Sequence, residues 1–131
     1  MRQPFQTGGV INLADREAGT EVTILAVPQG KRFVVEWVGV NAFMQPGQKL
    51  FAALHVTTAG YVGIYPIALV GSSTIADPTF PARAFGSQQV RFYADPETNL
   101  DFSIARHDAT AHARIFISVS GVLIDTRTGV S

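Results

Sequence analysis

Short apolar segments separated by turn-forming residues follow one another along the whole chain. The predicted strands cover residues 9–14, 21–27, 31–44, 49–57, 61–70, 87–94, 100–106 and 112–125. Glycine, proline, asparagine and aspartate are concentrated between these segments, and none of the segments has the 3.6-residue period of a helix. The pattern therefore predicts an all-β fold, an antiparallel β-sandwich of about eight strands with almost no helix. A jelly-roll-like topology is favoured, and an immunoglobulin-like sandwich is the alternative.

The segment KRFVVEWVGV (31–40) is apolar on both sides if it alternates as a strand does. One face would carry Phe33, Val35 and Trp37, and the other would carry Val34, Glu36, Val38 and Val40. The last predicted strand adds Phe116, Val122 and Ile124 to the second face. A two-sheet sandwich covers only one face of each sheet, so this second face needs another cover. We expect it to form the subunit interface of a homo-oligomer, a trimer being favoured, with Glu36 paired with an arginine at its rim.

Two further local features bear on the fold. Pro66 lies inside the predicted strand 61–70 and cannot donate to a strand ladder, which predicts an edge strand or a bulge. The stretch 71–86 reads as a long irregular loop with a possible short strand around Arg83. We expect Phe80 and Phe85 to dock this loop onto the body or onto a neighbouring subunit.

Length and composition fit one self-sufficient domain. The chain has 131 residues, enough for a core without metal or disulfides, and we expect a single β-sandwich domain over 1–131. Charged residues make up only 15% of the chain, against about 25% in ordinary soluble domains. This deficit is consistent with a surface that is partly covered by other molecules. The formal net charge is zero, so binding to nucleic acid is not expected.

The sequence also limits the chemistry, and it leaves the redox compartment open. There is no cysteine, which removes disulfides, thiolate metal sites and cysteine nucleophiles. No apolar run reaches about 18 residues, so no membrane span is expected. The opening MRQPFQTGG has no apolar segment of the signal-peptide kind.

Four phrases carry a resemblance to known proteins: RQPFQ, VPQGKRFVVEWV, GSQQVRFYADPETNLDFSI and ISVSGVLID. Together they resemble a loose set of small, uncharacterised exported bacterial β-sandwich proteins. The resemblance implies an extracellular or periplasmic location and brings no active site with it. The closing SVSGVLID is also similar to the last strand of trimeric jelly rolls of the complement-globular-head type.

Two turns carry possible metal ligands. Asp95, Glu97, Asn99 and Asp101 alternate along ADPETNLD and could offer oxygens to calcium, but the glycine and the distal glutamate of a calcium loop are missing. His107 and His112 flank the turn HDATAH and could serve zinc. In both cases a solvated hairpin turn is the favoured interpretation, and we expect no metal and no other cofactor.

No catalytic motif is visible. The chain has no Gly-x-Ser-x-Gly elbow, no phosphate-binding glycine loop and no His-x-His pair. We therefore expect a protein that is not an enzyme, without catalytic residues, and that serves as a structural or adhesive module associating through apolar sheet faces. The alternative is a small carbohydrate-binding module that stacks glycans on Tyr61, Tyr65 and Tyr93.

Overall fold

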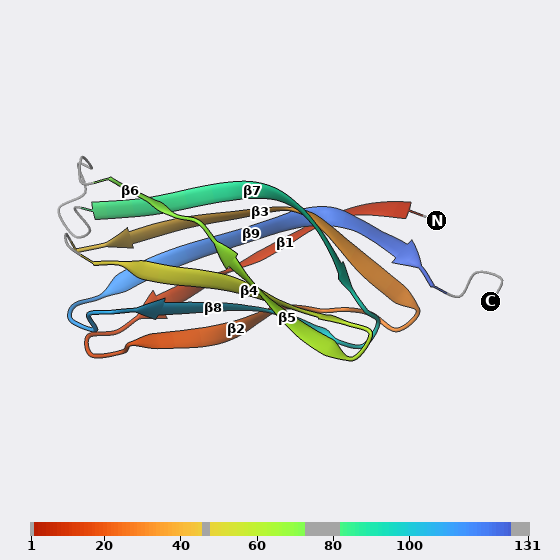
Figure 1. Cartoon of the computed structure of the whole chain (residues 1–131), viewed down its shortest axis with the longest axis horizontal. Helices are drawn as coiled ribbons and strands as arrows, with labels where there is room; N and C mark the ends of the chain where they lie inside the picture. Colours follow the sequence, from red (N-terminus) through yellow and green to blue (C-terminus); the bar gives the residue numbers. More distant parts are fainter. Residues whose placement is uncertain (1, 46–47, 73–81, 127–131) are drawn as a thin grey trace.

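In the part of the chain that the structure describes, nine antiparallel strands form two sheets that pack face to face (Figure 1). The computed structural model describes residues 2–45, 48–72 and 82–126. The strands are β1 (Arg2–Leu13), β2 (Gly19–Ala26), β3 (Lys31–Met44), β4 (Leu50–Thr58), β5 (Tyr61–Ile67), β6 (Val70–Ser72), β7 (Ala82–Ala94), β8 (Asn99–Arg106) and β9 (Ala113–Asp125). The described residues contain no helix. The predicted all-β sandwich is confirmed, although the first strand begins at Arg2 rather than at residue 9.

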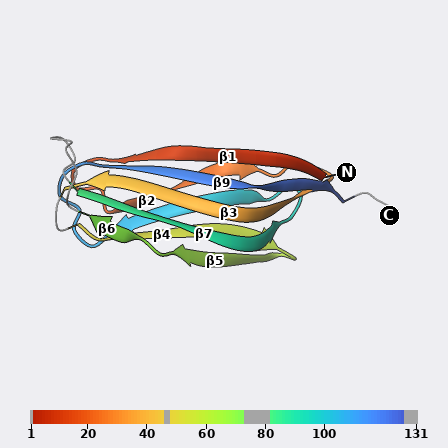
Figure 2. The ribbon, with the colours of Figure 1, turned by 90° about the horizontal axis from the view of Figure 1, so that it is seen from above.

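The strands pair in a nested order. One sheet has the order β1-β9-β3-β7-β6 and the other has the order β2-β8-β4-β5. The first strand thus pairs with the last, the second with the second-last and the third with the third-last, while β4 and β5 form the hairpin at the centre of the chain. Figure 2 shows β1, β9, β3 and β7 side by side in this order. This nesting is that of a jelly roll, so the topology favoured from the sequence is the one adopted.

The core fills the space between the sheets and is almost wholly apolar. Buried residues alternate with more exposed ones in β8 and through most of β9, as the two-residue period of a strand requires, and all of them are apolar except Arg106 at the end of β8. The largest fully buried side chains include Phe33, Leu54, Phe102 and Ile115, which come from both sheets. Apolar side chains from the two sheets thus meet in one core.

A β-bulge at Glu36 changes the face that β3 presents to the core. Val35 pairs with Gly121 of β9, but the next pair is Trp37 with Ser120, so Glu36 is an extra residue on β3. Alternation is therefore shifted by one residue after Val35.

The shift corrects the face assignment made from the sequence. Phe33 and Val35 before the bulge face the core, and Val38 and Val40 after it face the core as well. Trp37 points to the outside with 37% of its surface exposed. The expectation that Val34, Val38 and Val40 share an outer face is thus wrong, because that expectation assumed unbroken alternation.

Residues 82–86 are strand rather than loop. Arg83 pairs with Phe43 of β3, and Phe85 pairs with Asn41, so both belong to the long strand β7. The predicted docking of Phe85 by an irregular loop is therefore wrong, and Phe80 lies outside the described residues. Pro66, by contrast, lies in β5, which is the edge strand of its sheet, as its missing N–H predicted.

Candidate functional site

Large hydrophobic side chains remain exposed on both sheets of the sandwich. They are Val10, Trp37, Phe51, Tyr61, Val62, Ile64, Tyr65, Val70, Phe85, Tyr93 and Phe116. A cluster of exposed apolar residues of this kind is more informative than scattered ones, because it marks a surface that meets another molecule. Two such clusters are present, one on each sheet.

The predicted interface residues do not form one exposed patch. Val38 and Val40 are 0% and 4% exposed inside the core. Val34 faces outward, but at 5% exposure it is already covered within its own chain. Val122 lies beside it on β9, and both Val122 and Ile124 are half-buried. Phe116, on the same outer face, is 38% exposed.

Glu36 is half-buried at the bulge and belongs to a small polar group on this outer face. A hydrogen bond with Tyr93 raises the pKa of the Arg91 guanidinium, and the negative charge of Glu36 adds to that effect. The charge of Glu36 thus acts on an arginine of its own chain, and its pairing with an arginine at a subunit rim remains a prediction.

The first cluster lies on the four-stranded sheet and is called here the β4–β5 stripe. It consists of the outward-facing residues Phe51, Ala53, Val62, Ile64 and Pro66. Phe51, Val62 and Ile64 are 68%, 60% and 61% exposed. Sequence reasoning missed this stripe, although β5 carries apolar residues on both faces and residues 50–76 contain no Lys, Arg, Asp or Glu.

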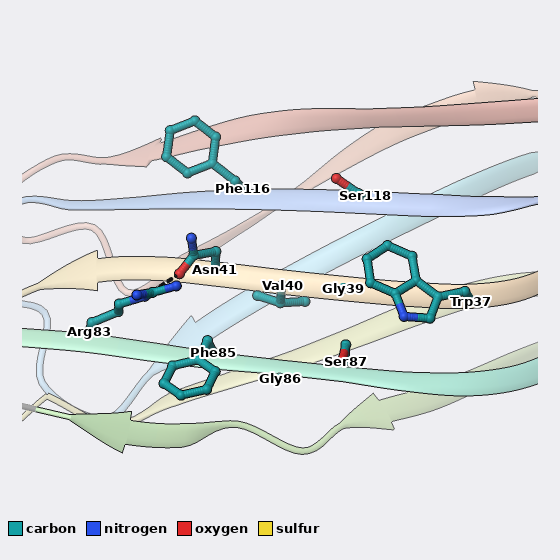
Figure 3. Close-up of a pocket in the computed structure, with 10 residues that line it drawn as sticks. All are labelled: Trp37, Gly39, Val40, Asn41, Arg83, Phe85, Gly86, Ser87, Phe116 and Ser118. Atoms are coloured by element: carbon teal, nitrogen blue, oxygen red, sulfur yellow. Dashed lines mark hydrogen bonds between the residues drawn. The ribbon is translucent and has the colours of Figure 1, made fainter.

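The second cluster surrounds a shallow cavity on the five-stranded sheet, called here the Trp37 groove. The cavity is about 350 Å³ in volume and is lined by Trp37, Gly39, Val40, Asn41, Arg83, Phe85, Gly86, Ser87, Phe116 and Ser118. Figure 3 shows it running along β3, with Phe116 on the β9 side, Phe85 on the β7 side and Trp37 at one end. Unbroken alternation along β3 did not predict the groove, because Trp37 reaches this face only through the bulge.

Gly39 allows the indole of Trp37 to lie flat along β3. A Cβ atom at position 39 would come within 2.3 Å of the outermost ring carbon of Trp37, which no side chain could accommodate without moving the ring. One ring face is therefore held against the strand, and Figure 3 shows the other turned toward the viewer. The result is a fixed, exposed aromatic surface on a rigid strand.

The three tyrosines predicted to bind glycan are not a common platform. Tyr61 and Tyr65 share a face of β5 as expected, but the ring of Tyr65 stacks on that of Phe92 with centroids 4.0 Å apart. Tyr61 is 80% exposed next to the β4–β5 turn. Tyr93 lies on β7 in the other sheet, beside Arg91. The three rings therefore do not form one surface on which a single glycan chain could stack.

The acidic turn residues are engaged in the fold. Asp95 accepts hydrogen bonds from Arg32 Nε at 3.1 Å and from a backbone N–H of the β4–β5 turn at 2.6 Å. Asp101 accepts one from the Thr23 hydroxyl at 2.6 Å. Glu97 adopts a left-handed backbone conformation in the turn, with φ of 61°. The carboxylates thus stabilise strand connections.

The histidine turn is likewise held by local bonds. His107 Nδ1 accepts from the backbone N–H of Lys49 at 3.2 Å. Hydrogen bonds from Thr110 lower the pKa of Asp108. His112 lines a different cavity beside Leu13. Within ranges 2–45, 48–72 and 82–126, no three His, Asp or Glu side chains gather closely enough to hold a metal ion.

A serine, a histidine and a glutamate meet on the outer face of the four-stranded sheet. His55 Nε2 lies 2.8 Å from Ser103 Oγ, and its Nδ1 lies 3.6 Å from Glu21 Oε2. This is the order of groups in a hydrolytic triad, but the second distance is too long for a hydrogen bond. Ser103 also lies in a strand paired on both sides, which leaves no neighbouring N–H groups for an oxyanion. The group is therefore a polar contact between strands.

Comparison with known proteins supports the fold. No protein-family model matches the chain, and no curated protein matches it. A chain of the cyanophage Pam1 capsid asymmetric unit aligns with TM-score 0.51 and 14% identity, over 92% of this chain and 85% of that one. This similarity shows a shared fold.

Two other solved structures align less well. A chain of infectious bursal disease virus, Gx strain, gives TM-score 0.49 and 9% identity over 96% of this chain and 32% of that one. The family 22 carbohydrate-binding module of Clostridium thermocellum Xyn10B gives TM-score 0.40 and 15% identity, over 92% of this chain and 84% of that one.

In the part of the chain that the structure describes, no helix is long and apolar enough to cross a membrane.

Proposed function

We propose that the protein is a non-enzymatic structural domain that associates with copies of itself through the β4–β5 stripe. The observation that carries the proposal is the exposure of Phe51, Val62 and Ile64, each of which has 60% or more of its surface in water. Fully burying one such side chain contributes about 1.5–3 kcal/mol, so several buried together stabilise a contact between chains.

The charge distribution around the stripe supports contact between copies. Residues 50–76 carry no Lys, Arg, Asp or Glu, so two stripes meet without repulsion between like charges. The other half of the same outer face is polar, with Glu21, Asp101 and His55 on β2, β8 and β4. A compact apolar area with a polar border is the arrangement found in stable interfaces.

Strand β5 is also a sheet edge with little protection. Soluble proteins discourage edge pairing with charged residues, prolines or bulges. Strand β5 has Pro66 near its end and no charged residue, whereas the edge strand β2 carries Glu21 and a bulge near Ile24. The edge therefore adds backbone groups to the surface that a second copy would meet.

The similarity to the cyanophage capsid chain supports a structural role, because that protein is part of a capsid asymmetric unit.

We propose that the oligomer is a trimer, with three stripes packed around a common axis. Antiparallel pairing of two β5 edges would instead give a dimer.

Light scattering after size exclusion tests the proposal. At tens of micromolar, the wild-type protein should have about three times its chain mass of 14.1 kDa. Ile64→Asp should reduce the mass to that of one chain and leave the far-ultraviolet circular dichroism unchanged, because Ile64 is exposed in the single chain.

The matched control is Val10→Asp, which places the same charge at an exposed valine of the edge strand β1 in the other sheet. This variant should keep the wild-type mass. A wild-type protein that stays monomeric at several hundred micromolar would refute self-association, and a mass of two chains would refute the trimer alone.

A further inference from the structure

The Trp37 groove combines a flat aromatic surface with free polar groups. The hydroxyl groups of Ser87 and Ser118 line it on opposite sides of Trp37 and have no protein partner among the described residues. Both serines lie on rigid strands, β7 and β9. A ligand in the groove would therefore meet an apolar floor and hydrogen-bonding walls.

The far end of the groove carries a cation without a carboxylate partner. Arg83 Nε donates to Asn41 Oδ1 at 2.7 Å, which fixes the guanidinium over the groove. The rings of Phe43 and Phe85 flank it, with centroids 5.8 and 4.9 Å away. In the described parts of the chain, no Asp or Glu pairs with Arg83, and its terminal nitrogens and the Asn41 amide nitrogen have no protein acceptor. These donors are available for an anion.

We propose that the Trp37 groove binds an acidic oligosaccharide. A pyranose ring has C–H bonds on one face, which pack on the exposed indole face of Trp37, and hydroxyl groups at its rim, which reach Ser87 and Ser118. From Trp37 to Asn41 the strand advances about 13 Å, so more than one sugar ring is needed to span the groove. The carboxylate of a uronic acid unit then meets the guanidinium of Arg83.

Carbohydrate fits the groove better than a second copy of the chain does. The groove is open and shallow, its floor at Gly39 is backbone, and its polar groups are spaced along it rather than placed around a rim. The groove also lies on the sheet opposite to the β4–β5 stripe, so the two surfaces act independently.

Fluorescence offers a direct test, because Trp37 is the single tryptophan of the chain. Titration with tetragalacturonic acid should shift and saturate the tryptophan emission, and binding should weaken as salt is added. By calorimetry, Trp37→Ala should weaken binding at least about tenfold, as the loss of a central aromatic contact does. Arg83→Gln should remove the preference for tetragalacturonic acid over the neutral probe cellotetraose.

The control variant is Tyr61→Ala, which removes a more exposed ring on the other sheet and should bind as the wild type does. Ile64→Asp should also bind normally, so failure of self-association and failure of this site are distinguishable. The proposal is overturned if neither tetrasaccharide changes the emission at millimolar concentration, or if Trp37→Ala binds as tightly as the wild type. Equal affinity of the wild type for the two probes would overturn the acidic preference.

Discussion

At the scale of single residues, Arg106 is the only charged side chain buried in the described core, with 5% exposure. Its guanidinium donates to four backbone carbonyls and one side-chain oxygen, those of Ala14, Glu17, Ala109, Thr110 and Gln48. It thereby joins the β1–β2 turn, the β8–β9 turn and the segment before β4. We predict that Arg106→Ala lowers the free energy of unfolding in urea by about 2–4 kcal/mol, because carbonyl groups are left buried without donors.

Arg114→Ala is the matched control for this measurement. Arg114 is exposed on β9, and its side chain donates a hydrogen bond from Nε to Asn12 Oδ1 at 2.9 Å. Its loss should cost less than about 1 kcal/mol. Equal losses for the two arginines would show that the Arg106 contacts do not stabilise the turns.

At the scale of elements, the bulge in β3 depends on a glycine in β9. A Cβ atom on Gly121 would lie 1.8 Å from the carbonyl oxygen of Val34 and 3.2 Å from the amide nitrogen of Glu36. These are backbone atoms, which cannot turn aside as a side chain can. We predict that Gly121→Ala lowers the free energy of unfolding by more than about 2 kcal/mol, because the strands beside the bulge must separate.

Gly9→Ala serves as the comparison, since Gly9 lies in β1 of the same sheet. A Cβ there would meet only side-chain atoms at 3.6 and 3.9 Å, which is ordinary contact. This variant should keep a urea midpoint close to that of the wild type. If both alanine variants unfold at the same urea concentration, the close approach at the bulge does not constrain the sheet.

At the scale of the whole molecule, stability comes from the apolar core shared by the two sheets. Side chains from β1, β3, β7 and β9 meet those from β2, β4 and β8 in one continuous cluster. We predict that the melting temperature is unchanged, within about 1 °C, by EDTA or by added calcium or zinc, because none of these ions would bind the native state selectively. Differential scanning calorimetry measures this, and a decrease of several degrees in EDTA would reveal a metal required for the fold.

The sequence by itself determined the class of fold and most strand positions. Alternation in β8 and β9, where Leu100, Phe102 and Ile104 face inward, is a local property that is read without knowing the partner strands. Pro66 marked an edge for an equally local reason, its missing N–H. Those features belong to a residue and its near neighbours, so the sequence is sufficient to predict them.

Only the tertiary structure decided which surface is free to bind. The bulge at Glu36 exists because β3 pairs with β9, a strand far along the chain, and β3 has one residue more than β9 between the pairs Val35–Gly121 and Trp37–Ser120. That single residue moved Val38 and Val40 into the core and brought Trp37 outside. Register between distant strands is set by packing and backbone pairing over the whole sheet, which no local pattern records.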